Sequence, residues 1–303
     1  MTPMRRGFAL PAVLWVVVSA STLALLGTFA ARDSVATAQN RVDGERAAWR
    51  AEGCLEEARA VMGDAIADER TAQASWNALD SVVQSSPFQS DGCVLSLVPA
   101  GVALDVNAAD DEQLHALLDA LGVGAARADS IVDAILDWRD ADDDVRPNGA
   151  EREWYDSRIL LGPRNGPLAS QGELKRIRGV AEVAGLDTLL TTEPGRVVVS
   201  RAPMAVLASL PGFASEALAR VAELRARGVP TPDLLGVCGL LSKESCDALT
   251  RRYSDLMQRS VTEPEAWIVT SRATSGARGV AAVVEVRVVR AGTRVAIVRR
   301  RDG

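Results

Sequence analysis

The sequence predicts an α+β protein in which a long N-terminal helix packs on a small antiparallel sheet, and a large all-α insertion divides that sheet. Three observations predict this fold. The chain carries no charge from Phe8 to Ala31 and then becomes amphipathic without a helix breaker. One strand pattern lies near residue 95, and three more lie beyond residue 264. Between them, helical patterns alternate with glycine turns.

The uncharged segment from Phe8 to Ala31 is long enough to span a bilayer, because a membrane helix needs about 20 apolar residues. Arg5 and Arg6 precede it, and Arg32 follows it. One interpretation is a secretory signal cut near Ala30, where small residues are available. Another is a plain single-span anchor whose leading arginines stay in the cytoplasm.

The junction between Gly7 and Phe8 supports a third interpretation. The chain starts with a very short basic leader (residues 1–7) that ends in a glycine before Phe8. An apolar helix (8–31) follows and continues into a polar one. This arrangement resembles the class III signal of type IV pilins and type II secretion pseudopilins. The resemblance implies that a prepilin peptidase cuts between Gly7 and Phe8, and that the new amino terminus is methylated.

The fifth mature position of such a chain is occupied here by Ala12. Most members of the family carry Glu there, which is thought to pair with the terminal amine of a neighbouring subunit. An uncompensated charge in hydrocarbon is costly, so a subunit with nothing above it to pair with can do without that carboxylate. The pseudopilin subtype that lacks it is general secretion pathway protein K.

We expect one helix from Phe8 to about Met62, about 80 Å long at about 1.5 Å per residue. Apolar residues recur at helical spacing from Val35 to Met62, and this stretch contains no proline. Its first half is expected to lie in lipid and its second half on the sheet. Residues 66–91 are a predicted connection.

Strand patterns occupy the two flanks of the insertion. On the first flank, residues 32–106, they are Cys93–Val98 and Val102–Val106. On the second flank, residues 261–303, they are Glu265–Ser271, Ala281–Arg290 and Thr293–Val298, the last two joined as a hairpin at Ala291–Gly292.

The insertion, residues 107–260, contains an imperfect repeat of helix, glycine turn and helix, with units at about 107–195 and 200–260. These units resemble SAM-like or helix-hairpin-helix modules. Helix-hairpin-helix modules often bind DNA phosphates, and a membrane-anchored DNA-binding protein of the competence type is the chief alternative function. The turns lack a cation cluster and the net charge is −6, so we expect no nucleic-acid partner.

An acidic stretch follows the first repeat, with nine carboxylates against three arginines between Asp133 and Asp156. Anions packed this closely need solvent or a shared cation. Asp140, Asp142, Asp144 and Glu151 occupy the first, third, fifth and twelfth places of a loop like that of an EF-hand. The sixth place is Val145 where the EF-hand needs Gly, so the sequence predicts a different hard-cation site or a solvated loop.

This region also resembles protein K, which reads much like DWxDxDxxxRPxGAE followed by an aromatic pair. The matching residues here are Asp137-Trp138, Asp140, Asp142, Arg146-Pro147, Gly149-Ala150-Glu151 and Trp154-Tyr155. The resemblance implies calcium binding, with Asp137, Asp140, Asp142, Asp144 and Glu151 as candidate ligands. The segment from Asn165 to Leu174 continues the resemblance, and Ser170 with Glu173 predicts a capping box.

Four cysteines in a segment expected to face an oxidising space favour disulfides. Three pairings exist, and we favour Cys238–Cys246, which are close in sequence, with Cys54–Cys93, which would tie the long helix to the first strand. The single histidine, His115, is expected to be a partly exposed helix residue.

No nucleophile, base and orienting group occur together, so no enzyme is predicted. The resemblance implies a minor pseudopilin at the tip of a type II secretion pseudopilus, where it initiates or caps assembly. Its implied partners are the pseudopilins of types I and J, the major pseudopilin and the prepilin peptidase. Its implied location is the inner membrane, with a single span and the C-terminal region in the periplasm.

Overall fold

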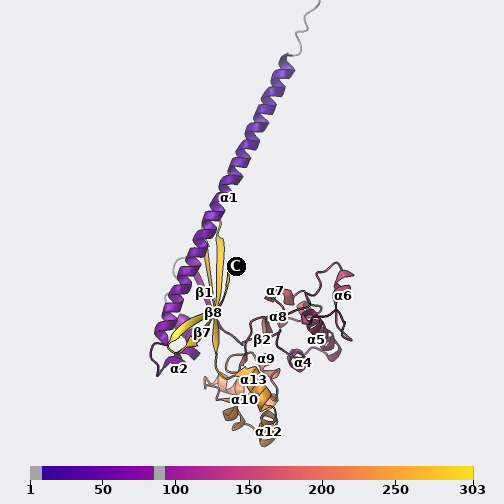
Figure 1. Cartoon of the computed structure of the whole chain (residues 1–303), viewed down its shortest axis with the longest axis vertical. Coiled ribbons are helices and arrows are strands. Elements are labelled where there is room, and N and C mark those ends of the chain that lie inside the picture. The colour runs from indigo at the N-terminus through magenta and orange to yellow at the C-terminus, as the bar shows by residue number, and fades with distance from the viewer. Residues whose placement is uncertain (1–8, 85–92, 303) are drawn as a thin grey trace, which may run out of the picture.

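The computed structural model describes residues 9–84 and 93–302. Its longest element is helix α1 (Ala9–Ala65), whose 57 residues extend about 85 Å at about 1.5 Å per residue. Figure 1 shows this helix projecting far beyond the rest of the molecule. Pro11 lies in its first turn, where a missing N–H breaks no helical hydrogen bond. The predicted cleavage junction at Gly7 and Phe8 lies outside the described residues.

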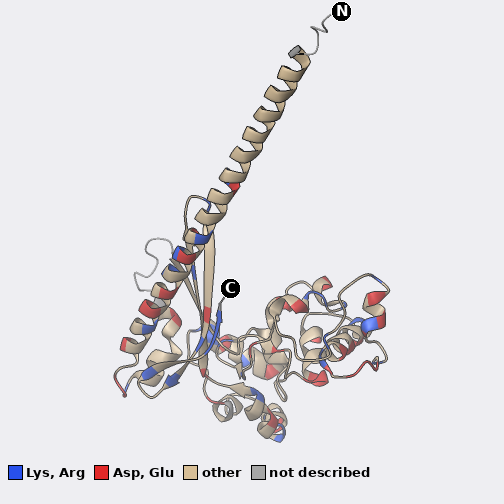
Figure 2. Cartoon of the chain, turned by 45° about the horizontal axis from the view of Figure 1, so that its top comes forward, with Lys and Arg blue, Asp and Glu red and all other residues tan. Residues whose placement is uncertain are grey.

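The two halves of α1 have different surroundings. The first half is apolar enough to cross a membrane, by length and composition, and its side chains are exposed. Figure 2 shows that the outer part of the helix carries no charge. In the second half, side chains at intervals of three and four residues are fully buried against the sheet, and these are Ala47, Ala51, Leu55, Ala58 and Met62.

The sheet is antiparallel and has the order β1-β6-β7-β8. Its strands are β1 (Cys93–Pro99), β6 (Ala266–Ser275), β7 (Val280–Ala291) and β8 (Arg294–Asp302). Strand β1 lies beside β6, with Cys93 opposite Ala273 and Pro99 opposite Trp267. The chain therefore leaves the sheet after β1 and returns next to its point of departure.

Two tryptophans join the sheet to the helices that follow α1. Trp76 lies on α2 (Ala72–Asn77), which precedes α3 (Leu79–Gln84). The Trp76 indole donates to the Pro264 carbonyl at 2.9 Å, and the Trp267 indole donates to the Trp76 carbonyl at 3.1 Å. Both indoles are almost fully buried, and their polar atoms are satisfied, as burial requires.

The insertion consists of short helices around its own core. They are α4 (Asp111–Ala120), α5 (Ala125–Arg139), α6 (Arg152–Asp156), α7 (Gln171–Leu174), η1 (Val180–Glu182), α8 (Leu186–Leu189), α9 (Met204–Ala208), α10 (Ser215–Ala226), α11 (Leu234–Cys238), α12 (Lys243–Arg251) and α13 (Tyr253–Arg259). The repeated glycine turns are α4 to α5, with φ 73° at Gly122, and α9 to α10, with φ 82° at Gly212.

The strand predicted at Val102–Val106 is shorter and does not join the sheet. It is β2 (Leu104–Asp105), which pairs in parallel with β3 (Leu190–Thr191). A second parallel pair joins β4 (Val197–Val198) to β5 (Ser260–Val261). Gly101 redirects the chain here, because its φ of 91° and its closeness to the Arg196 carbonyl leave no room for a side chain.

The capping box forms at a different helix from the one predicted. Ser170 precedes α7, but its side chain makes no cap; the Glu173 carboxylate instead accepts from the Ala169 amide at 3.2 Å. A complete capping box lies at α4, where Asp110 and Gln113 bond each other's backbone amides.

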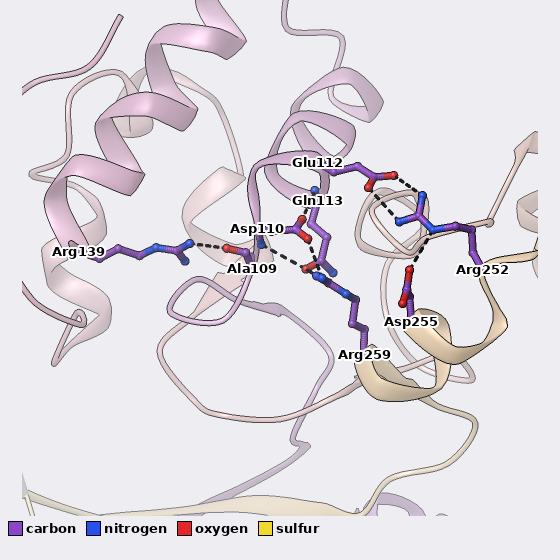
Figure 3. A network of polar contacts seen from close by, with 8 residues as sticks. All are labelled: Ala109, Asp110, Glu112, Gln113, Arg139, Arg252, Asp255 and Arg259. Atoms are coloured by element: carbon purple, nitrogen blue, oxygen red, sulfur yellow. Dashed lines mark hydrogen bonds and ion pairs between the residues drawn. The ribbon is translucent and has the colours of Figure 1, made fainter. Parts of the chain in front are cut away.

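Arginine side chains join the two halves of the insertion (Figure 3). Arg252 donates two hydrogen bonds of 3.0 Å to the Glu112 carboxylate. Arg259 donates to Asp110 at 2.6 Å and also to Gln113. Since Asp110 and Gln113 form the capping box of α4, the start of this helix is fixed from both sides.

One carboxylate connects the insertion to the sheet. Glu193, which follows β3, forms ion pairs with Arg301 at 2.8 Å, with Arg287 at 3.9 Å, and with Arg299. These arginines lie on β7 and β8, and the Glu193 side chain is only 15% exposed. Ion pairs that share a partly buried carboxylate are stronger than isolated surface pairs, so this contact helps to fix the insertion against the sheet.

Candidate metal centre

Three carboxylates converge where α5 ends and α6 begins. Asp137 lies in the last turn of α5, Asp140 directly follows that helix, and Glu151 directly precedes α6. One oxygen from each lies within 4.8 Å of the others. Asp137 is fully buried and Glu151 is 5% exposed. Within the ranges that the structure describes, this is the one group of three or more potential metal ligands.

The connection between α5 and α6 packs tightly on Asp137. The Arg146 amide donates to both Asp137 oxygens at 3.3 Å. Gly149 lies so close that a Cβ atom there would be 1.9 Å from Asp137 Oδ2. Any side chain at residue 149 would therefore displace the carboxylate, which explains why glycine is needed there.

Aromatic and cationic side chains hold α6 in place. Tyr155 packs edge-on against Trp138, with ring centroids 5.3 Å apart. The Arg158 guanidinium lies 4.1 Å from the centre of the Trp154 ring, a cation–π contact. Arg178 donates to the Gly149 carbonyl at 3.0 Å. The acidic group thus rests on packed elements, even though the loop between them is exposed.

The electrostatics of this group favour a cation. Burial raises the pKa of Glu151 to about 7, and the nearby Asp137 and Asp140 carboxylates add to the shift. Burial also raises the pKa values of Asp137 and Asp140. Among the described residues, both Glu151 oxygens and Asp140 Oδ1 are buried and have no hydrogen-bond donor. A bound cation would satisfy these oxygens and favour their charged form.

The donor set fits a hard divalent ion. Calcium–oxygen distances of about 2.3–2.6 Å place opposite ligand oxygens about 4.6–5.2 Å apart, and the three carboxylates fall within 4.8 Å of one another. Zinc prefers nitrogen and sulfur ligands, which this group lacks. Asp137, Asp140 and Glu151 would therefore supply the protein's anionic oxygens to calcium.

Asp142 and Asp144 lie outside this group. Both are exposed, and Asp142 Oδ1 accepts a hydrogen bond from the Asp144 amide at 3.0 Å. The structure thus divides the five predicted ligands into three that converge and two that face solvent. The spacing of an EF-hand loop does not bring its third and fifth positions to the site, because the backbone turns outward between Asp140 and Arg146.

Asn165 is a residue of this region whose role the sequence did not reveal. It adopts a left-handed φ of 52°, and its amide donates to the Asp142 carbonyl at 2.6 Å and to Asp143 Oδ1 at 2.8 Å. The Asn-Gly pair at 165–166 was the available signal, because Asn tolerates left-handed turns. Asn165 fixes the acidic loop from the far side.

The remaining candidate residues lie elsewhere. Disulfides join Cys54 to Cys93, with Cα atoms 6.6 Å apart, and Cys238 to Cys246, with Cα atoms 4.8 Å apart. The first links α1 to β1, and the second links α11 to α12. His115 is 34% exposed on α4 and contacts the Asp111 and Asp129 carboxylates.

Comparisons with known proteins agree with this architecture. Residues 79–186, which include the acidic site, match the family model described as type II secretion system (T2SS), protein K. No curated protein gives a significant match. A chain in the crystal structure of the GspK-GspI-GspJ complex from the enterotoxigenic Escherichia coli type 2 secretion system shares the fold, with a TM-score of 0.62 and 18% identity.

That likeness covers 88% of this chain and 98% of the other. It confirms the predicted combination of a long N-terminal helix with a mixed helical and antiparallel body. The family match over residues 79–186 and the shared fold agree with the resemblance inferred from the sequence, and they support a relationship to the type II secretion protein K family of minor pseudopilins.

Proposed function

We propose that this chain is a minor pseudopilin that occupies the tip of the pseudopilus, where it initiates or caps assembly for the secretion of folded proteins across the outer membrane. The position of the helical insertion supports this role most directly. The insertion lies at the end of the body away from the start of α1 and extends sideways from the sheet (Figure 1). In a packed filament it would occupy the space of the next subunit, whereas at the tip that space is free.

The proposed role is structural, without catalysis. The proposed location is the inner membrane, which α1 spans once, with the body in the periplasm. The support for this orientation is the basic start of the chain at Arg5 and Arg6, because positively charged flanks of a membrane helix stay in the cytoplasm. The insertion is proposed to comprise two SAM-like units, supported by the repeated glycine turns at Gly122 and Gly212.

The proposed partners are the minor pseudopilins of types I and J, as the components of the solved complex suggest. Helix α1 offers a surface for them. Val42 and Trp49 lie one heptad apart on α1, and they are 45% and 74% exposed. Apolar residues seven apart fall on one helix face and suit packing against another helix.

Replacing Trp49 with Ser is therefore expected to weaken this contact. Loss of an exposed aromatic anchor at a helix interface costs about 2 kcal/mol or more, or roughly a thirtyfold loss of affinity. Co-purification of the full chain with tagged type I and J pseudopilins measures the effect. The matched control is Arg41→Ser, which changes another exposed residue of α1 but removes no aromatic side chain. Equal recovery of partners with both variants would contradict the proposed surface.

The tip position is tested by labelling assembled pseudopili. An epitope inserted after Gly228, in an exposed turn of the insertion, should bind antibody–gold particles at one end of each fibre only. Electron microscopy of pseudopili sheared from cells that express the tagged chain gives the distribution. Gold particles at regular intervals along the fibres would show that the subunit enters the shaft and would rule out the tip model.

Maturation is proposed to occur by prepilin peptidase cleavage between Gly7 and Phe8, followed by methylation. The support is the sequence of the junction, where basic residues precede the glycine and an apolar helix follows it. N-terminal sequencing of the mature chain should begin at methylated Phe8, and Gly7→Val should leave the leader attached because the peptidase site loses its small residue. A mature terminus near Ala31 would instead indicate an ordinary secretory signal.

Calcium is proposed to bind at Asp137, Asp140 and Glu151, where buried carboxylate oxygens lack donors. A ligand bound only by the folded state at a hundred times its Kd adds about 2.7 kcal/mol to stability. Thermal unfolding of the purified full chain should therefore show a fall in Tm of several degrees when EGTA removes calcium.

Glu151→Gln is expected to abolish this calcium-dependent rise, because the variant retains the shape of the side chain and loses its charge. Asp144→Asn removes a carboxylate from the same loop but outside the convergent group, so its response to calcium should match that of the unmodified chain. If EGTA leaves the Tm unchanged, or if both variants respond alike, calcium does not bind as proposed.

A further inference from the structure

A groove separates α1 from the turn between β6 and β7. It has a volume of about 1090 Å³ and is lined by α1 residues from Thr28 to Arg50 and by turn residues 275–278. The turn itself is exposed from Gly276 to Gly279. The groove therefore begins where the uncharged part of α1 ends, and the turn forms its roof.

The lining of the groove changes from apolar to basic along its length. The end of the groove nearest the uncharged part of α1 is lined by Ala31 and Val35. The rest of the lining includes four arginines and one carboxylate: Arg32, Arg46, Arg50, Arg278 and Asp43. Asp43 is only 5% exposed, and it accepts from the Gln39 amide at 3.2 Å. The groove thus has a net positive charge.

Two of these arginines are held by neutral acceptors. Arg50 donates to the Thr274 carbonyl at 3.2 Å, and Arg278 donates to the Asn40 side-chain oxygen at 3.4 Å. These contacts orient the guanidinium groups without neutralising them. Their charge remains available to an anion in the groove, and a guanidinium matches the geometry of a phosphate oxygen pair.

The height of the turn suits a membrane surface. Asn40, which contacts Arg278, lies about 13 Å above Ala31 at about 1.5 Å per residue. The polar layer of one leaflet is about 5–8 Å thick. A lipid headgroup next to Ala31 would therefore lie between the end of the apolar helix and the turn. It would be within reach of Arg32 on the membrane side and of Arg278 on the side of the sheet.

We propose that this groove binds an anionic phospholipid of the bilayer that α1 spans. The phosphate and headgroup lie among the arginines, and the first part of an acyl chain follows Thr28, Ala31 and Val35. The lipid would hold the body at a set height above the membrane before the subunit enters a fibre. This inference depends on membrane insertion of α1, but it does not depend on the tip position.

Photocrosslinking in vesicles tests the proposal. The full chain carries p-benzoylphenylalanine at Ala277 in the roof and is reconstituted into phosphatidylcholine vesicles with or without phosphatidylglycerol. Mass spectrometry should find phosphatidylglycerol joined to residue 277 in excess over its share of the lipid. The same probe at Thr293, in the turn between β7 and β8, is the positional control and should yield no lipid adduct.

Arg278→Gln and Arg32→Gln should each reduce the phosphatidylglycerol adduct about fivefold, the effect expected for one cation near an anionic surface. Arg294→Gln, next to the control turn, should leave it unchanged. The proposal is overturned if residue 277 labels phosphatidylcholine and phosphatidylglycerol in proportion to their amounts and the arginine variants do not change this labelling. An adduct between residue 277 and a second protein chain would also overturn it. Alkaline carbonate washes peripheral proteins off vesicles but leaves membrane-spanning ones in place. If carbonate extracts the chain, α1 does not span the membrane; if the chain resists carbonate but gives no lipid adduct, only the groove proposal is wrong.

Discussion

The pairing of β1 with β6 is the contact on which the rest of the structure depends. It joins a strand that ends at Pro99 to one that begins at Ala266, and everything between them is the helical insertion. Closing so long a loop costs conformational entropy, although the cost rises only slowly with length. The reciprocal tryptophan contacts lie at one end of this strand pair and the Cys54–Cys93 bridge lies at the other, and both help to offset that cost.

Local patterns in the sequence predicted the elements of this fold well. The absence of a breaker cluster between the uncharged segment and the amphipathic one predicted one helix from Phe8 to about Met62, and the structure has α1 from Ala9 to Ala65. Alternating β-branched residues predicted β6, β7 and β8 within a few residues of their ends. The strand at β2 was predicted, but its parallel pairing with β3 and the whole β4–β5 pair were missed, because a two-residue strand carries no period of its own and forms only where its partner meets it.

The candidate site was predictable in composition but not in arrangement. The sequence identified the acidic stretch, yet only the carboxylates at helix ends converge, since α5 and α6 aim them at one point while the loop turns Asp142 and Asp144 to solvent. Which carboxylates become buried depends on how α5 packs against α6 through Trp138 and Tyr155, and on Arg178, whose amide donates to the Tyr155 hydroxyl from farther along the chain. No spacing rule contains that information. The same holds for Glu193, whose three arginine partners lie far away in the sequence.

The two ends of the insertion emerge side by side, with Pro99 opposite Trp267. In an antiparallel sheet, neighbouring strand ends need only a tight turn to connect them. The helical domain therefore occupies the place of a hairpin loop, and its removal would leave every strand pairing of the sheet intact. An ancestral fibre subunit could have acquired such a domain in a single recombination event at this loop, and the domain could then diverge without disturbing the module that carries it.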